Sequence, residues 1–85
     1  MIGPAEIRLK RLKMRSMRRG IREMDLILTA YAEHNLATMS DGALNNYEAL
    51  LNENDHDLYQ WVTGQTPAPE RYQRLIAGIS AILQD

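Results

Sequence analysis

The sequence predicts an all-α protein, a small bundle of about five short helices. Three observations lead to this prediction. The apolar residues are mostly Leu, Ile, Met and Ala, which favour helices. They recur three and four residues apart, and no stretch alternates apolar and polar residues as a half-buried strand does. The connecting segments are short and contain Gly, Pro or helix-capping residues, as in helical bundles.

The first expected helix covers residues 5–18, which are rich in Lys, Arg, Leu and Met and contain no Gly or Pro. Its apolar residues do not form one clean stripe. Gly20 then marks a break or a close contact, because a glycine inside a helix costs about 1 kcal/mol relative to Ala. A second helix is expected over about residues 21–34, and Asn35 can end it in a left-handed conformation.

The remaining helices are expected in the second half of the chain. The third covers residues 41 to about 52, with the Ser40 hydroxyl as its N-cap. Polar residues 54–57 cap a short fourth helix, which Gly64 ends. Pro69 is expected as the first residue of the last helix, because its missing N–H is not needed there. The apolar stripes expected to form the core are Ile21, Met24, Ile27, Leu28 and Tyr31, then Ala43, Leu44, Tyr47, Leu50 and Leu51, and finally Tyr72, Leu75, Ile76, Ile79, Ile82 and Leu83.

Length and composition limit the organisation of the chain. Eighty-five residues leave room for one domain, predicted over residues 1–85 with its core over about 5–84. A hydrophobic content of 45% is typical of a folded chain. The absence of cysteine excludes disulfides and thiolate zinc sites. No apolar stretch approaches the roughly 20 residues of a membrane span, so we expect no direct membrane insertion.

The charge is divided along the chain. Residues 1–22 hold eight Lys or Arg and one Glu, a net charge of +7, whereas residues 23–85 hold two Arg and ten acidic residues, a net charge of −8. A basic arm on an acidic body indicates an interaction surface. Nucleic-acid binding through the phosphates is one interpretation, but the acidic body would repel them and no aromatic residues lie among the cations. Protein binding through arginine–carboxylate pairs fits better, and a plain solvated helix face is the simplest alternative.

The residues offer no evident catalytic or metal site. His34 and His56 lie in different elements, without the i, i+4 pairing of a metal-binding helix. Residues 54–57 lack the alternating ligands, the glycine and the final Glu of a calcium loop. The five glycines are scattered and form no phosphate-binding pattern. The protein is therefore predicted not to be an enzyme and to hold no metal and no tightly bound cofactor.

The sharpest pattern is Arg-Arg-Gly-Ile-Arg-Glu-Met-Asp at residues 18–25. Gly20 has no side chain, so another backbone can approach it closely. Arg19 and Arg22 offer guanidinium groups beside it. Glu23, three residues on, is expected on the same helical face as Gly20. The segment therefore offers either a docking notch flanked by both signs of charge or a helix junction with local ion pairs.

This segment resembles the RGxxE signature of the SdhE family of succinate dehydrogenase assembly factors, also called the YgfY or flavinator family. Three further stretches agree in order and spacing: Ala32-Glu33-His34, residues 44–52 and the stretch at residues 55–61. The last reads Asp-His-Asp-Leu-Tyr-Gln-Trp and is similar to the family's Asp-x-Asp-Leu-aromatic-x-Trp segment. The resemblance covers roughly residues 8 to 80.

The resemblance implies a bundle of about five helices and a non-enzymatic assembly factor, or chaperone. Members bind the flavoprotein subunit of succinate dehydrogenase, and often of fumarate reductase. They promote covalent attachment of FAD to a histidine of that subunit without forming the bond themselves. Arg19, Gly20 and Glu23 match the three fixed letters of the signature, and neighbouring arginines on the same basic stretch are added to them. The predicted partner-binding residues are Arg15, Arg18, Arg19, Gly20, Arg22 and Glu23.

Two other functions are kept as alternatives: a nucleic-acid-binding helical module that uses the basic arm, and a toxin-neutralising partner, a label that some members of this family have carried. The chain has no cysteine and no evident presequence, so we expect it in the bacterial cytoplasm. A monomer is the default at this size.

Overall fold

The computed structural model describes residues 2–84, so Met1 and Asp85, the ends of the predicted domain, lie outside the described residues. All regular elements of the described part are helices, and it contains no strand. Its α-helices are α1 (Pro4–Ser16), α2 (Arg22–Asn35), α3 (Asp41–Leu51), α4 (Asp55–Val62) and α5 (Gln73–Ser80). Short 3-10 helices cover Leu36–Thr38, Glu70–Tyr72 and Ala81–Gln84. The predicted all-α bundle of about five helices is confirmed.

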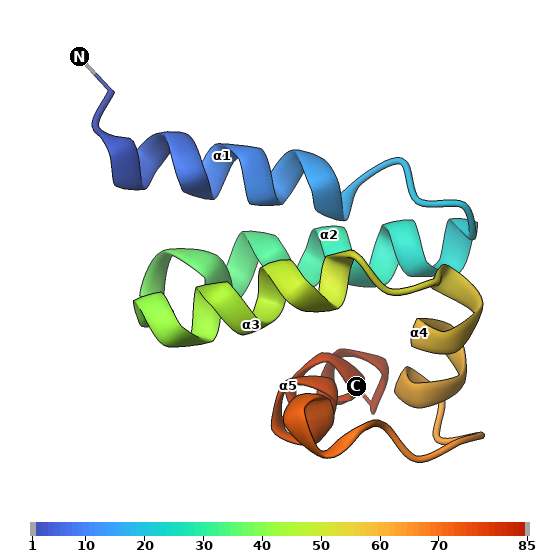
Figure 1. Ribbon diagram of the computed structural model, residues 1–85. Coiled ribbons are helices and arrows are strands. Elements are labelled where there is room, and N and C mark those ends of the chain that lie inside the picture. Colours follow the sequence, from blue (N-terminus) through green and yellow to red (C-terminus); the bar gives the residue numbers. More distant parts are fainter. Residues whose placement is uncertain (1, 85) are drawn as a thin grey trace.

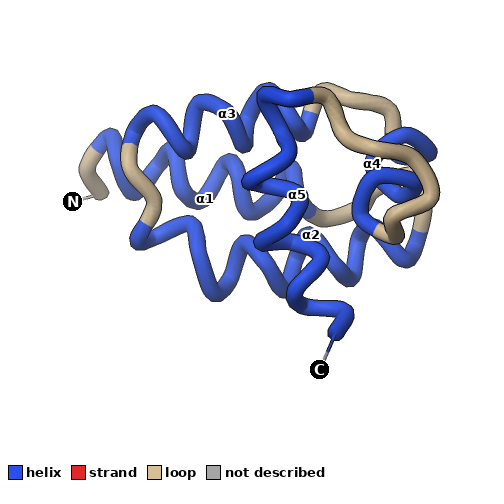
Figure 2. Tube along the Cα trace, turned by 90° about the horizontal axis from the view of Figure 1, so that it is seen from below, coloured by secondary structure: helices blue, strands red, loops and turns tan. Residues whose placement is uncertain are grey.

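The first three helices lie side by side and form the longer part of the molecule, with α2 antiparallel to α1 (Figure 1). Helices α4 and α5 pack against each other and against α2 at one side of this layer. Seen from below, α5 crosses the direction of α1 and α3 (Figure 2). The loop between α1 and α2 lies at the same end of the molecule as the start of α4 (Figure 1).

The apolar stripes of α2, α3 and α5 meet in a single core. The core also receives Leu12 from α1, which is fully buried. Trp61 and Tyr59 of α4 are partly buried against the core, and the Trp61 ring stacks on Tyr72 with 5.9 Å between the ring centroids. The buried apolar residues are Leu12, Met24, Ile27, Leu28, Tyr31, Ala32, Leu36, Leu44, Tyr47, Leu50, Leu51, Leu58, Val62, Tyr72, Ile76 and Ile79. Most of these positions belong to the stripes read from the sequence, so burial of apolar surface accounts for the arrangement of the helices. The expectation that Leu83 lies in the core is wrong: it is 48% exposed, because α5 ends at Ser80 and its α-helical stripe does not extend to this residue.

Two of the predicted helix caps are confirmed. The Ser40 hydroxyl accepts a hydrogen bond from the Ala43 N–H at 3.1 Å at the start of α3. The Asn54 side chain accepts one from the His56 N–H at 2.8 Å at the start of α4. Gly64 follows α4 with a φ of 81°, a conformation that glycine adopts without a steric penalty.

Three helix boundaries differ from the prediction. Helix α1 ends at Ser16, because Met17 is extended. Asn35 does not adopt the left-handed conformation: its φ is −124°, its side-chain amide donates to the Tyr31 carbonyl, and the chain continues into a 3-10 helix. Pro69 is extended with a ψ of 147°, so the helical residues begin after it. In each case a local hydrogen bond or an extended residue moves the boundary.

Candidate functional site

The signature arginine and glycine lie in the turn of residues 17–21 that joins α1 to α2. Arg18 has a φ of 56°, the one positive value among the non-glycine residues that the structure describes. A side chain in this left-handed conformation costs on the order of 1 to 2 kcal/mol, so the surrounding structure must hold it. The Arg18 backbone N–H donates to Asp25 Oδ2 at 3.0 Å, which ties the turn to the first turns of α2.

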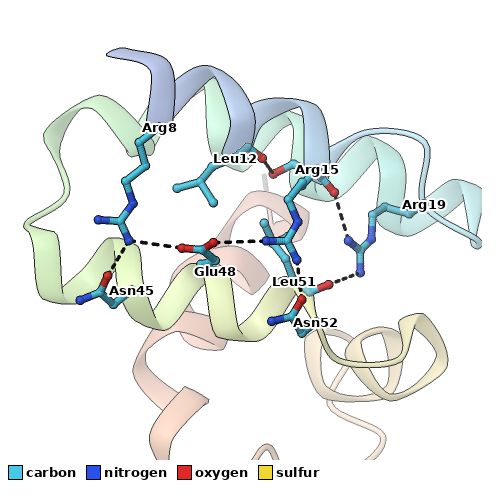
Figure 3. Close-up of polar contacts among 9 residues, drawn as sticks. Arg8, Leu12, Arg15, Arg19, Asn45, Glu48, Leu51 and Asn52 are labelled. Atoms are coloured by element: carbon cyan, nitrogen blue, oxygen red, sulfur yellow. Dashed lines mark hydrogen bonds and ion pairs between the residues drawn. The ribbon is translucent and has the colours of Figure 1, made fainter. Parts of the chain in front are cut away.

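Arg19 points into the protein rather than outward. Its side chain is 12% exposed, and its Nε and Nη2 both lie 2.8 Å from Asp55 Oδ1. Its Nη1 donates to the Arg15 carbonyl at 3.0 Å and its Nη2 to the Leu51 carbonyl at 3.1 Å (Figure 3). Arg19 therefore connects the end of α1 with the end of α3 and the start of α4.

Gly20 contacts the same carboxylate. Its backbone N–H donates to Asp55 Oδ2 at 2.5 Å, and a Cβ added to Gly20 would lie 3.2 Å from that oxygen. The glycine thus accommodates a close approach, as the sequence indicated, but the approaching group is a carboxylate of this chain. We call the contacts of Arg19 and Gly20 with Asp55 the Asp55 clasp.

Four exposed residues lie next to the clasp along the chain, in the turn and in the first turns of α2: Arg18, Arg22, Glu23 and Leu26. We call them the signature rim. Within the described residues 2–84, no side-chain hydrogen bond or ion pair engages Arg18, Arg22 or Glu23. Leu26 is 62% exposed and lies within one helical turn of Arg22 and Glu23. The rim therefore presents both signs of charge beside an apolar side chain.

The expectation that Glu23 shares a helical face with Gly20 is wrong. Helix α2 begins at Arg22, so Gly20 lies outside the helix and the helical spacing rule does not apply to it. The turn rather than a helical face sets the position of Glu23 relative to Gly20.

Arg15 lies apart from the rim, on the side of α1 that faces α3. Its guanidinium contacts Glu48 Oε2 at 3.5 Å and the Asn52 side chain, and Arg8 contacts Glu48 Oε1 at 3.5 Å and Asn45 (Figure 3). We call these contacts of Arg8 and Arg15 with Glu48 the outer row. The structure thus separates the six predicted residues into a rim (Arg18, Arg22, Glu23), a clasp (Arg19, Gly20) and the outer row (Arg15).

Sequence reasoning missed the contribution of Asp55, because neither the helix cap at residues 54–57 nor the Asp-x-Asp segment connects this residue with the turn between α1 and α2. It also missed Ser16, which is fully buried and joins α1 to α3. The Ser16 hydroxyl donates to the Leu12 carbonyl at 2.8 Å and lies 2.6 Å from the Tyr47 hydroxyl. Burial raises the pKa of Tyr47 to about 12, although the hydrogen bond with Ser16 opposes the shift. The start of the Asp-x-Asp segment was the one signal that could have drawn attention to Asp55.

The described residues contain no cluster of three or more His, Cys, Asp or Glu side chains that could hold a metal ion. Among them there is also no helix long and apolar enough to cross a membrane. An open depression of about 540 Å³ lies between α2, α3 and α5, with Tyr31, Met39 and Arg71 in its lining. None of the signature residues lines it, and the expected lack of a tightly bound cofactor stays a prediction.

Comparison with known proteins gives one consistent family. The family described as "Flavinator of succinate dehydrogenase" (Sdh5) matches residues 10–83. "Succinate dehydrogenase assembly factor 2, mitochondrial" of Danio rerio is 43% identical over 70 residues, which cover 80% of this chain and 44% of that protein. The protein of the same name from Candida glabrata is 46% identical over 66 residues, 74% of this chain and 43% of the relative. "Succinate dehydrogenase assembly factor 2-A, mitochondrial" of Drosophila sechellia is 37% identical over 78 residues, 89% of this chain and 48% of the relative. The chain spans about half the length of the curated relatives it matches.

Proposed function

This chain belongs to the Sdh5 family, the flavinators of succinate dehydrogenase, and from that membership we propose that it is a non-enzymatic assembly factor. It binds the flavoprotein subunit of succinate dehydrogenase, and in a related role that of fumarate reductase, and promotes covalent attachment of FAD. The resemblance read from the RGxxE signature is confirmed by the family match. The single observation that carries the proposal is this match over residues 10–83, which include the turn at residues 17–21, here called the signature turn.

The chain supplies binding rather than a reacting group. The bond forms inside the partner, between its own FAD and its own histidine. A protein that binds one domain arrangement of the partner better than another shifts the partner toward that arrangement, by as much as the two affinities differ. A tenfold preference corresponds to about 1.4 kcal/mol. The assembly factor therefore acts by favouring the arrangement in which the flavin and the histidine meet.

The signature rim suits this role chemically. The guanidinium groups of Arg18 and Arg22 can donate paired hydrogen bonds to carboxylates. Glu23 can accept hydrogen bonds from a mobile group of the partner, and Leu26 adds an apolar contact. Charges of both signs around an apolar residue fix the orientation of a bound partner more than they raise the affinity. The rim is thus suited to recognising one arrangement of the flavoprotein subunit.

Two finer assignments belong to this proposal. The names of the relatives call those proteins mitochondrial, so the expected bacterial cytoplasm stays a prediction that cell fractionation would check. Nucleic-acid binding is not favoured, because Arg8, Arg15 and Arg19 already pair with carboxylates of this chain. Strong, salt-dependent binding to random duplex DNA would reverse that judgement.

The test uses the purified flavoprotein subunit without covalent flavin, mixed with FAD and with or without this chain. Covalent flavin is read as fluorescence of the subunit in a denaturing gel. We expect the chain to increase the signal strongly and Glu23→Ala to reduce that increase about tenfold, the size expected for a contact that aids docking. Glu33→Ala is the matched control, since Glu33 is also exposed and lies on α2, ten residues further along. Equal signals with and without the chain would overturn the proposal.

A further inference from the structure

We infer that Asp55 is a positioning residue of the docking site, and that Arg19 and Gly20 act on the partner through Asp55 while the signature rim makes the contact. The inference rests on the proposed function and deepens it. It gives Arg19 and Gly20, two of the three signature residues, a role within the protein, and it adds Asp55, which lies outside the signature. Three features of the structure lead to it.

The first feature is that the guanidinium nitrogens of Arg19 are already bonded within the chain. Its Nε, Nη1 and Nη2 all have acceptors within the chain: Asp55, and the carbonyls of Arg15 and Leu51. The Arg19 and Asp55 side chains are 12% and 15% exposed. An arginine that bound a partner carboxylate would need its donors free and its guanidinium group in solvent. Arg19 meets neither condition.

The second feature is that the backbone N–H of Gly20 also donates its hydrogen bond to Asp55. Its N–H bonds Oδ2, while Arg19 binds Oδ1, so the two carboxylate oxygens hold consecutive residues of the turn. The space that a side chain would occupy at Gly20 lies against the same carboxylate. Gly20 therefore lets Asp55 approach the turn, which explains the glycine without a partner.

The third feature is the strained conformation next to the clasp. Arg18 has a positive φ, and it is a member of the rim. Asp25 holds the Arg18 backbone from one side and Asp55 holds Arg19 and Gly20 from the other. A turn that is held in its binding conformation before docking loses less conformational entropy on binding. Loss of Asp55 should therefore disorder the rim and weaken docking, although Asp55 does not touch the partner.

The chain contains a matched control for Asp55. Asp57 lies in the same first turn of α4, has the same charge and is exposed. Both carboxylates interact favourably with the positive end of the helix dipole. Of these two aspartates, only Asp55 contacts the turn at residues 17–21. Comparing them therefore separates the effect of the clasp from the general effect of an acidic residue at this helix end.

A double-mutant cycle tests the inference. The dissociation constant for the flavoprotein subunit without covalent flavin is measured by calorimetry for Arg19→Ala, Asp55→Ala and the double variant. We expect each single variant to bind about tenfold more weakly. The double variant should bind no more weakly than the weaker single variant, because both substitutions remove the same contact, that between Arg19 and Asp55. Asp55→Asn keeps one accepting oxygen and should lie between, and Asp57→Ala should change binding by less than about twofold. Combining Arg22→Ala with Asp55→Ala should weaken binding by less than the product of the two single losses, since Asp55 acts through the rim to which Arg22 belongs.

Two results would overturn the inference. One is an Asp55→Ala variant that binds as the original chain does while Arg19→Ala binds weakly. The other is a double variant whose loss equals the product of the single losses, since Arg19 would then contact the partner directly.

Amide hydrogen exchange at Gly20 provides a readout that needs no partner. Protection at Gly20 should fall at least about tenfold in Arg19→Ala and in Asp55→Ala and stay unchanged in Asp57→Ala and Glu23→Ala. Unchanged protection in Asp55→Ala would overturn the positioning role. Failure of the original chain to bind the subunit would overturn the proposed function instead, and the exchange data would still decide whether Asp55 holds the turn. Circular dichroism on each variant distinguishes a local change from unfolding.

Discussion

The outer row and the Asp55 clasp both pair arginines of the basic segment with a carboxylate, but they differ in distance and exposure. In the outer row, Arg8 and Arg15 share Glu48 at 3.5 Å, and the side chains are 28 to 40% exposed. In the clasp, Arg19 lies 2.8 Å from Asp55, and the side chains are 12% and 15% exposed. The clasp also includes a backbone donor, the N–H of Gly20.

The difference shows that the arginines of the basic segment at residues 1–22 do not share one role. Solvent screens the outer row, and such pairs contribute about 0 to 1 kcal/mol. The clasp is mostly shielded from water, so the loss of either partner leaves a charge without compensation. The same residue type therefore stabilises the fold at Arg19, adds little at Arg8 and Arg15, and faces solvent at Arg18 and Arg22.

The largest expected effect is that of Arg19→Ala on stability. Because Asp55 would lose its cation, we expect the free energy of unfolding to fall by about 2 to 4 kcal/mol. Urea unfolding followed by circular dichroism measures it. Arg22→Ala is the control and should change stability by less than about 0.5 kcal/mol. Equal losses in the two variants would remove the distinction between clasp and rim.

The buried contact between Ser16 and Tyr47 sharpens the comparison, because it joins α1 and α3 from inside, as the outer row does from outside. The pKa of Tyr47 is about 12 in the folded protein, above its usual value of 10. Folding therefore favours the protonated phenol. The stabilisation of the folded protein by this preference is complete below pH 10 and is lost as the pH rises from 10 to 12. The loss amounts to about 2 to 3 kcal/mol at pH 12.

Urea unfolding at a series of pH values between 8 and 12 would measure this loss. Tyr47→Phe should be less stable by about 1 kcal/mol at pH 8, because it lacks the hydrogen bond with Ser16. Its stability should fall less steeply at alkaline pH than that of the original chain. Identical slopes would contradict the assignment to Tyr47.

Gly20→Ala should have an intermediate effect. The added Cβ would lie 3.2 Å from Asp55 Oδ2, so the carboxylate must shift and the clasp loosens. We expect a loss of about 1 kcal/mol in the free energy of unfolding. Gly42→Ala is the control with the opposite sign: nothing lies within 4 Å of its added Cβ, and Ala in the first turns of α3 should stabilise by about 0.5 to 1 kcal/mol. A destabilisation of the same size at both positions would argue against the close approach at Gly20.

The smallest expected effect is that of Glu48→Ala, which removes both ion pairs of the outer row. We expect a loss of no more than about 1 kcal/mol at low salt, and less at 0.5 M NaCl, because the pairs are exposed and screened. Thermal unfolding at the two salt concentrations measures it. A loss as large as that of Arg19→Ala, and independent of salt, would show that exposure does not separate the two regions.

Much of the fold follows from local patterns. The stripes of α2, α3 and α5 predicted the core, and the caps at Ser40 and Asn54 predicted the starts of α3 and α4. These signals act within one or two helical turns, so they can be read along the chain. The contribution of α1 was less readable, because its inward face combines Leu12 with the polar Ser16.

The site could be predicted only in part. Residues 18–25 were recognised as the important segment, and the need for a glycine at position 20 was recognised as a close approach. The approaching group, Asp55, lies 35 residues further on, and no local pattern connects it to Gly20. The division of the arginines into inward and outward ones depends on the same packing, so spacing along the chain could not show it.

The sequence by itself determined the helices, their apolar faces, the divided charge and the family, because these depend on residue type and short spacing. The tertiary structure alone decided which charges face solvent and which are held inside. Helix packing brings the start of α4 to the turn between α1 and α2, and there the carboxylate of Asp55 meets Arg19 and Gly20. Such contacts form between segments far apart in the chain, and their energies depend on burial, which only the folded structure sets.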